Sequence, residues 1–142
     1  MNREIIFKAK RKDNGEWVEG CLIIDYVSGQ YFIHQNGNSV NESQKIGEEG
    51  CLRFLAFEID PNTLCQYTGI TDKNGEKIWE NDIIDTFEES SKEFLRNVVK
   101  FEDGCFKVFK KHYLSMHMDS YEKTDLKVVG NIFDNADLLE VE

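Results

Sequence analysis

The sequence predicts a mostly β protein of the sandwich or barrel class. Many short apolar segments are separated by turns rich in Gly and Asn, which is typical of such folds. One Pro, ten Gly and 40% hydrophobic residues argue against a disordered or collagen-like chain. A chain of 142 residues is long enough for one good core, or for two small ones.

The first thirty residues predict a β-hairpin. Apolar residues alternate over 5–10, and the turn cluster Lys12-Asp13-Asn14-Gly15 follows. Asn-Gly favours a hairpin because both residues tolerate positive φ. The return strand spans 17–24, and a further short strand is expected at 31–34.

A polar loop and the single proline separate two halves of the chain. Residues 35–50 are polar and contain several Gly and Asn, so we expect an exposed loop there. Residues 51–59 return to strand, and Asp60-Pro61-Asn62 makes the next turn. We therefore divide the chain into an N-terminal part, residues 1–61, and a C-terminal part, residues 62–142.

The second half predicts more strands around tight turns. The segment 64–69 precedes the turn Asp72-Lys73-Asn74-Gly75, and 77–84 follows it. Residues 86–97 fit either a short helix or an extended loop. The other expected elements are strands at 98–101, 105–109 and 126–133, and a final helical turn at 136–139 capped by Asp134 or Asn135.

The charge balance is acidic, with 27 acidic and 17 basic side chains and a formal net charge of −10. This disfavours a surface that neutralises many phosphates, and it suits a soluble protein or one that binds basic partner surfaces. The longest apolar runs have four residues, far below the roughly 20 of a membrane span. The first residues contain no apolar export segment, so we expect a cytoplasmic protein with no membrane association.

Conventional sites for metals or catalysis are not indicated. Cys21, Cys51, Cys65 and Cys105 form no C-x₂-C pair, and their apolar neighbours predict reduced, buried thiols.

The turn at Asp72 fails as an EF-hand, because its sixth and twelfth positions are Lys77 and Ile83. His112 and His117 are five residues apart and would face opposite sides of a strand. No catalytic, phosphate-loop or dinucleotide motif is present, so we expect no catalytic residue, metal or cofactor.

Two basic clusters are the candidates for nucleic-acid contact. A small barrel can stack bases on aromatic side chains within a basic groove. The clusters are Lys8, Lys10, Arg11 and Lys12, and then Lys107, Lys110, Lys111 and His112 with the interleaved Phe106, Phe109 and Tyr113. The alternative is that the aromatics are core residues and the lysines are solvated, which the negative charge of the whole chain favours.

One block of the sequence resembles the YopX family of bacteriophage and prophage proteins. Residues 66–84 read QYTGITDKNGEKIWENDII, close to the family block QYTG-x-x-D-x-x-G-x-x-I-[YW]-E-G-D-I. Segments 3–9, 98–104 and 128–139 resemble other parts of the family in the same order. Lys10 stands where members commonly carry an aromatic residue. Asn81 replaces the Gly of the EGD turn, and Asn tolerates the positive φ that such a turn uses.

The resemblance implies a β-rich fold of two dissimilar sandwich-like parts and a phage or prophage origin inside a bacterial cell. It implies no particular activity. Within the block, Gly69 and Gly75 would shape turns, and Asp72 and Asn74 would close one with side-chain bonds. Ile78, Ile83 and Ile84 would be core.

Tyr67, Trp79 and Asp82 form the candidate interaction patch of the block. A half-exposed Tyr and Trp beside an Asp would suit a protein interface, while a purely structural role for all three is the favoured interpretation.

The leading hypothesis is a non-enzymatic accessory protein that binds a host or phage protein. The alternative is a small-barrel nucleic-acid-binding regulator. Self-association through exposed strand edges is a further expectation.

Overall fold

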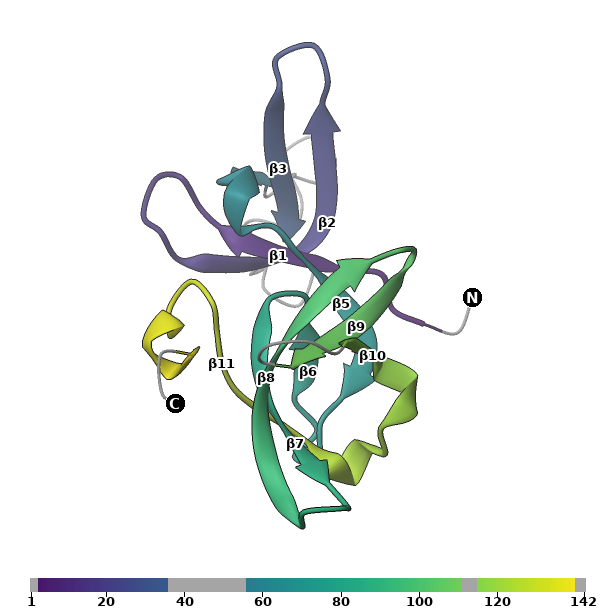
Figure 1. The fold of residues 1–142 in the computed structure, drawn as a ribbon. Helices are drawn as coiled ribbons and strands as arrows, with labels where there is room; N and C mark the ends of the chain where they lie inside the picture. The colour runs from purple at the N-terminus through teal and green to yellow at the C-terminus, as the bar shows by residue number, and fades with distance from the viewer. Residues whose placement is uncertain (1–2, 36–55, 111–114, 140–142) are drawn as a thin grey trace. The chain divides into compact units, whose positions relative to one another are not determined.

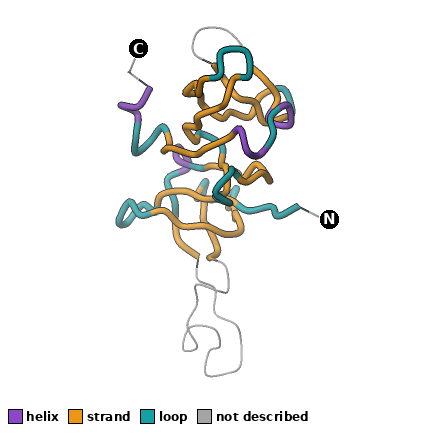
Figure 2. Tube along the Cα trace, turned by 90° about the horizontal axis from the view of Figure 1, so that it is seen from below, coloured by secondary structure: helices purple, strands orange, loops and turns teal. Residues whose placement is uncertain are grey.

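The computed structural model describes residues 3–35, 56–110 and 115–139, and strands dominate it while the helical segments are short (Figures 1 and 2). The predicted class, a mostly β protein of two dissimilar parts with little helix, is confirmed. Two compact units make up the chain, Met1–Gln66 and Tyr67–Glu142. The sequence placed the division after Pro61. The units divide after Gln66, because Cys65 and Gln66 pair with the first strand.

The first unit is an antiparallel sheet whose strands follow the order β4-β3-β2-β1. These strands are β1 (Phe7–Lys10), β2 (Trp17–Asp25), β3 (Gln30–Gln35) and β4 (Ala56–Glu58). β1 also pairs with the first residues of β5 (Cys65–Thr71), after a short 3-10 helix η2 (Pro61–Thr63). The core of this unit consists of Ala9, Val18, Ile33 and Ile59.

The predicted hairpin at the N-terminus is confirmed. β1 pairs with β2 from Phe7 opposite Gly20 to Lys10 opposite Trp17. Gly15 has φ of 73° in the connecting turn, as the Asn-Gly pair indicated, and its N–H donates to the Arg11 carbonyl at 2.9 Å.

Gly20 occupies the point where β2 changes neighbours. It lies opposite Phe7 of β1 and opposite Gln35 of β3. A Cβ added to Gly20 would collide with the backbone carbonyl of His34. A glycine is therefore required for the backbones of β2 and β3 to approach each other here.

In the second unit, β5 continues and pairs with β6 (Lys77–Trp79), and a five-stranded antiparallel sheet follows in the order β10-β9-β8-β7-β11. Its strands are β7 (Asp82–Glu88), β8 (Glu93–Glu102), β9 (Cys105–Lys110), β10 (Ser115–His117) and β11 (Leu126–Asn131). The 3-10 helices are η3 (Met118–Ser120), η4 (Lys123–Asp125) and η5 (Ala136–Leu139), the last of which is the predicted final turn. The core comprises Ile78, Ile84, Val99, Val108, Met118 and Leu126.

Residues 86–97 form neither the short helix nor the extended loop that the sequence allowed. They belong to a β-hairpin, in which β7 pairs with β8 from Glu88 opposite Glu93 to Ile83 opposite Val98. Asn97 Nδ2 donates to Thr86 Oγ1 at 2.7 Å, across the hairpin and away from solvent. Cross-strand bonding of this kind decides the structure where local helix propensity is ambiguous.

The expectation of buried cysteines holds for one of the three that the structure describes. Cys65 is buried, Cys105 is half-buried and Cys21 is exposed, because Cys21 lies on the open face of β2. Cys51 and nearly all of the expected loop at 35–50 lie outside the described residues.

Replacing Gly20 with Ala should destabilise the first unit by about 3 kcal/mol, because the new Cβ meets backbone that cannot move aside cheaply. Denaturant unfolding followed by tryptophan fluorescence would measure the loss. Gly29→Ala is the matched control on the same hairpin, since Gly29 has φ of 74° but open space around it. It should cost about 1 kcal/mol. Equal losses in the two variants would contradict the steric argument.

Candidate functional site

The structure brings Tyr67, Trp79 and Asp82 together but buries them. Tyr67 lies opposite Trp79 across β5 and β6, with ring centroids 5.5 Å apart. The backbone N–H of Trp79 donates to Asp82 Oδ2 at 2.8 Å. Tyr67, Trp79 and Asp82 are 8%, 5% and 2% exposed, so the half-exposed rings that a binding patch would use are not seen. Their role as a binding patch stays a prediction, and this geometry supports the structural alternative.

Asn81 makes the turn between β6 and β7 that the sequence block indicated. Its φ of 71° is the left-handed conformation that a Gly would adopt without strain. The Asn81 N–H donates to the Val99 carbonyl at 2.8 Å, and its carbonyl accepts from Ile132 at 3.0 Å. The turn therefore joins three segments of the second unit.

Asp72 is a buried carboxylate that organises another turn. Oδ1 accepts from the N–H groups of Asn74 at 2.8 Å and Glu76 at 3.0 Å, which closes the predicted turn. Oδ2 accepts from the N–H of Val128 in β11 at 3.0 Å. Burial by itself raises the pKa of Asp72, but the bonds from Val128, Glu76 and Asn74 outweigh it, and the pKa is lowered.

The end of the β7–β8 hairpin presents apolar side chains to solvent. Phe94 and Leu95 are 47% and 41% exposed, and Phe94 packs on Phe87 with ring centroids 5.2 Å apart. Among the described residues, pairing of β7 with β11 ends at Thr86, and pairing of β8 with β9 begins at Asn97, so the end of the hairpin lies beyond the described pairing with both neighbours. The hairpin is labelled β7 and β8 in Figure 1.

Carboxylates outnumber amines around this hairpin end. Glu88 and Glu93 lie directly opposite each other, and Glu89 follows in the turn. Lys92 pairs with Glu89 at 3.7 Å, and the Lys73 amine lies 5.3 Å from the centroid of the Phe94 ring. The sequence did not single out Phe94 or Leu95. The signal was available in the aromatic residues at 87 and 94, which suit a cross-strand pair around a polar turn.

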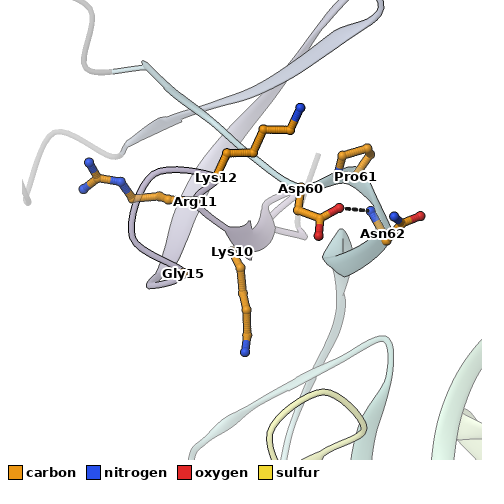
Figure 3. A pocket seen from close by; sticks show the side chains of 7 residues that line it. All are labelled: Lys10, Arg11, Lys12, Gly15, Asp60, Pro61 and Asn62. Atoms are coloured by element: carbon orange, nitrogen blue, oxygen red, sulfur yellow. Dashed lines mark hydrogen bonds between the residues drawn. The ribbon is translucent and has the colours of Figure 1, made fainter.

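All members of the first basic cluster except Lys8 line a pocket of about 540 Å³ at the end of β1 (Figure 3). Lys10, Arg11 and Lys12 contribute to its wall with Gly15 and the segment 60–62. In Figure 3 the three basic side chains point in different directions, and Asp60 Oδ1 accepts from the Asn62 N–H at 3.0 Å. The basic groups therefore do not converge on one point.

Acidic neighbours also compensate much of this charge. Arg11 donates to both carboxylate oxygens of Asp13, at 2.9 and 2.6 Å, and this bonding lowers the pKa of Asp13. Lys12 lies 3.1 Å from Glu58. Lys8 and Lys10 place their amines 4.7 and 5.5 Å from the centroid of the Trp17 ring.

The second basic cluster is only partly described. Lys107 pairs with Asp103 at 3.3 Å. Phe106 packs edge-on against Phe101, with ring centroids 5.0 Å apart. Lys111, His112 and Tyr113 lie outside the described residues.

Within residues 3–35, 56–110 and 115–139, no three His, Cys, Asp or Glu side chains are grouped as a metal would require. A two-membered contact joins Cys105 Sγ and His117 Nδ1 at 3.9 Å. None of the helices in these ranges is long and apolar enough to cross a membrane.

A family model described as YopX protein matches residues 6–140. The chain belongs to the YopX family. Two solved structures share the fold across their whole length. Protein EF1440 from Enterococcus faecalis matches with a TM-score of 0.60 and 20% identity, over 97% of this chain and 99% of that one. YopX from Bacillus subtilis matches with a TM-score of 0.59 and 17% identity, over 96% and 98%. No curated protein sequence matches the chain.

Asp72→Asn should destabilise the second unit by about 2 kcal/mol. Its amide NH₂ would replace one of the two carboxylate oxygens and cannot accept a hydrogen bond, so at least one of the three backbone N–H groups would lose its acceptor. The pKa of Asp72 is lower in the folded state. Its stabilising contribution is therefore fully present above the unfolded value of about 3.9 and is lost as pH falls through the folded pKa.

Urea unfolding between pH 7 and pH 3 would measure both effects. The variant should lose less stability than the wild type as pH falls below about 4. Asp137→Asn, at an exposed position on η5, is the control and should leave both the stability and its pH dependence unchanged. If the free energy of unfolding of Asp72→Asn and of the wild type fell in parallel with pH, Asp72 would not be the source of the pH dependence.

Proposed function

We propose that this YopX-family protein is a non-enzymatic accessory protein of phage or prophage origin that binds a host or phage protein in the bacterial cytoplasm. The observation that carries the proposal is the β7–β8 hairpin end, where Phe94 and Leu95 are exposed beyond the described pairing with β11 and β9. Aromatic and aliphatic anchors of this kind fill pockets at protein interfaces. Binding of this kind needs no cofactor.

Two further features support this choice of surface. The tilted contact of Phe94 with Phe87 and the Asn97–Thr86 hydrogen bond stabilise the hairpin in the absence of a partner. A surface ordered in advance loses less conformational entropy on binding. The excess of carboxylates at the hairpin end, together with the net charge of −10, favours a partner with a basic rim around its apolar pocket.

Affinity capture from lysate of the bacterial host, with and without nuclease, tests this proposal. Tagged wild-type protein should retain a nuclease-resistant protein partner, and Phe94→Ser should lose it by about tenfold or more. Phe101→Ser is the matched control. Phe101 is also on β8, is 50% exposed and packs edge-on against another Phe, but its sequence neighbour Asp103 makes an ion pair with Lys107.

The Phe101→Ser variant should keep the partner. Capture that survives Phe94→Ser, or that both variants lose equally, would overturn the assignment of this hairpin. Circular dichroism of both variants would confirm that each is folded.

A second candidate function is nucleic-acid binding, and the basic pocket beside Lys10, Arg11 and Lys12 is the observation that favours it. Fluorescence anisotropy with labelled single- and double-stranded DNA at two salt concentrations would test it. If the first proposal holds, the double variant Lys8→Glu/Lys10→Glu should show the same affinity for DNA as the wild type. Lys127→Glu, at an exposed position of β11, is the control.

The opposite result would promote this second candidate. In that case the wild type would bind DNA with an affinity that depends on salt. The slope of the logarithm of the binding constant against the logarithm of the salt concentration would fall in magnitude by about 2 in the double variant and stay unchanged in Lys127→Glu.

A further inference from the structure

The outer half of β2 has an open edge. β1 pairs with β2 only as far as Gly20, whereas β3 pairs with β2 from Gly20 to Asp25. Within the described residues, the segment Cys21–Asp25 therefore has a neighbouring strand on one side only. Figure 1 shows β2 and β3 continuing as a two-stranded hairpin beyond β1. On the far side of the same hairpin, β4 covers β3 at Phe32–His34.

This open edge lacks the usual protection against strand pairing. Natural edge strands carry charged residues, Pro or bulges that discourage another strand from adding to them. The segment Cys21-Leu22-Ile23-Ile24 contains none of these, and β-branched residues favour strand pairing. The β7–β8 hairpin differs, because Glu88, Lys92 and Glu93 surround its exposed end.

Exposed apolar surface gathers along the same segment. Ile23 is 38% exposed, and Cys21 on the same face of β2 is exposed as well. The turn that follows carries Tyr26 and Val27, which are 86% and 100% exposed. Asp25 Oδ1 accepts from the Val27 N–H at 3.0 Å, so the turn that presents these side chains is held in place.

We propose that this edge is a self-association surface, on which β2 of a second copy adds as an antiparallel strand centred on Ile23. Such pairing is isologous, since each copy offers the same edge to the other. It places Ile23 opposite Ile23, Leu22 opposite Ile24, and Cys21 opposite Asp25. Asp25 faces the uncharged Cys21, so no two like charges oppose each other in this register, and β2 of a second copy fits the edge without charge repulsion across the ladder.

Pairing in this register is limited to Cys21–Asp25, because Phe7 of β1 already occupies the edge of β2 at Gly20. The main-chain bonds of five residues and the covered Ile23 side chains supply the affinity. Each copy carries a net charge of −10, and this repulsion opposes association. Screening by salt should therefore tighten the dimer. The surface uses no residue of the β7–β8 hairpin, so the two proposals are tested separately.

Sedimentation velocity of the full chain over a range of protein concentrations tests the proposal. The wild type should form dimers whose dissociation constant falls as the salt concentration rises. Ile23→Lys places two ammonium groups opposite each other and should weaken the dimer about tenfold or more. Phe101→Lys is the matched control, because Phe101 is 50% exposed on a β-strand of the second unit and lies outside both proposed surfaces, and its dimer should equal that of the wild type.

A cross-linking measurement checks the register. In a Cys21→Ser background, Ile23→Cys should form a disulfide between copies under a thiol oxidant such as diamide, because directly opposite residues lie within disulfide reach. Peptide mass spectrometry would identify the 23–23 linkage. A protein that stays monomeric at all concentrations, a dimer unaffected by Ile23→Lys, or a dimer without the 23–23 linkage would overturn the proposal.

Discussion

The carboxylate of Asp72 joins elements of the second unit that are far apart in the sequence. One of its oxygens closes a four-residue turn between β5 and β6, and the other accepts from Val128, 56 residues further along the chain. The adjacent Lys73 N–H also donates, to the Leu126 carbonyl at 3.1 Å. A buried charge is tolerated here only because three N–H groups solvate it in place of water. The position of β11 in its sheet thus depends on a bond made outside the sheet's own ladder.

Turn chemistry was the part of the fold most accessible from sequence. The turns at Asn14-Gly15 and at Asp72–Gly75 depend on residues within four positions of one another, so local patterns identify them. The left-handed conformation of Asn81 follows from the same reasoning, because Asn accepts the φ of 71° that its position demands. The bond from Val128 to Asp72 could not be anticipated, since nothing local marks a partner so distant in the chain.

Exposure was harder to predict than secondary structure. Alternation within a strand divides side chains between two faces, but it does not say how far neighbouring strands cover each face. A binding role for Trp79 and Tyr67 would have used half-exposed rings, and both residues are buried. Cys21 was expected to be buried and is exposed. The hairpin at residues 86–97 escaped prediction for a related reason, because the buried Asn97–Thr86 bond exists only once the two strands have paired. The ion pair between Lys12 and Glu58 could not be predicted either, because the two residues are distant in the sequence and come together only in the folded protein.

β5 has a consequence for any attempt to dissect the chain. Its first two residues pair with β1 in the first unit, while Tyr67 pairs with Trp79 in the second. No spacer separates Gln66 from Tyr67, so a gene fragment that ends at this boundary cuts a strand in two. A fragment of the first unit that ends before Cys65 would leave β1 without a paired strand on the side away from β2, and unpaired strand edges promote aggregation. Fragments that extend through Thr71 retain the residues that pair with β1, so they are the rational starting point for producing the first half alone.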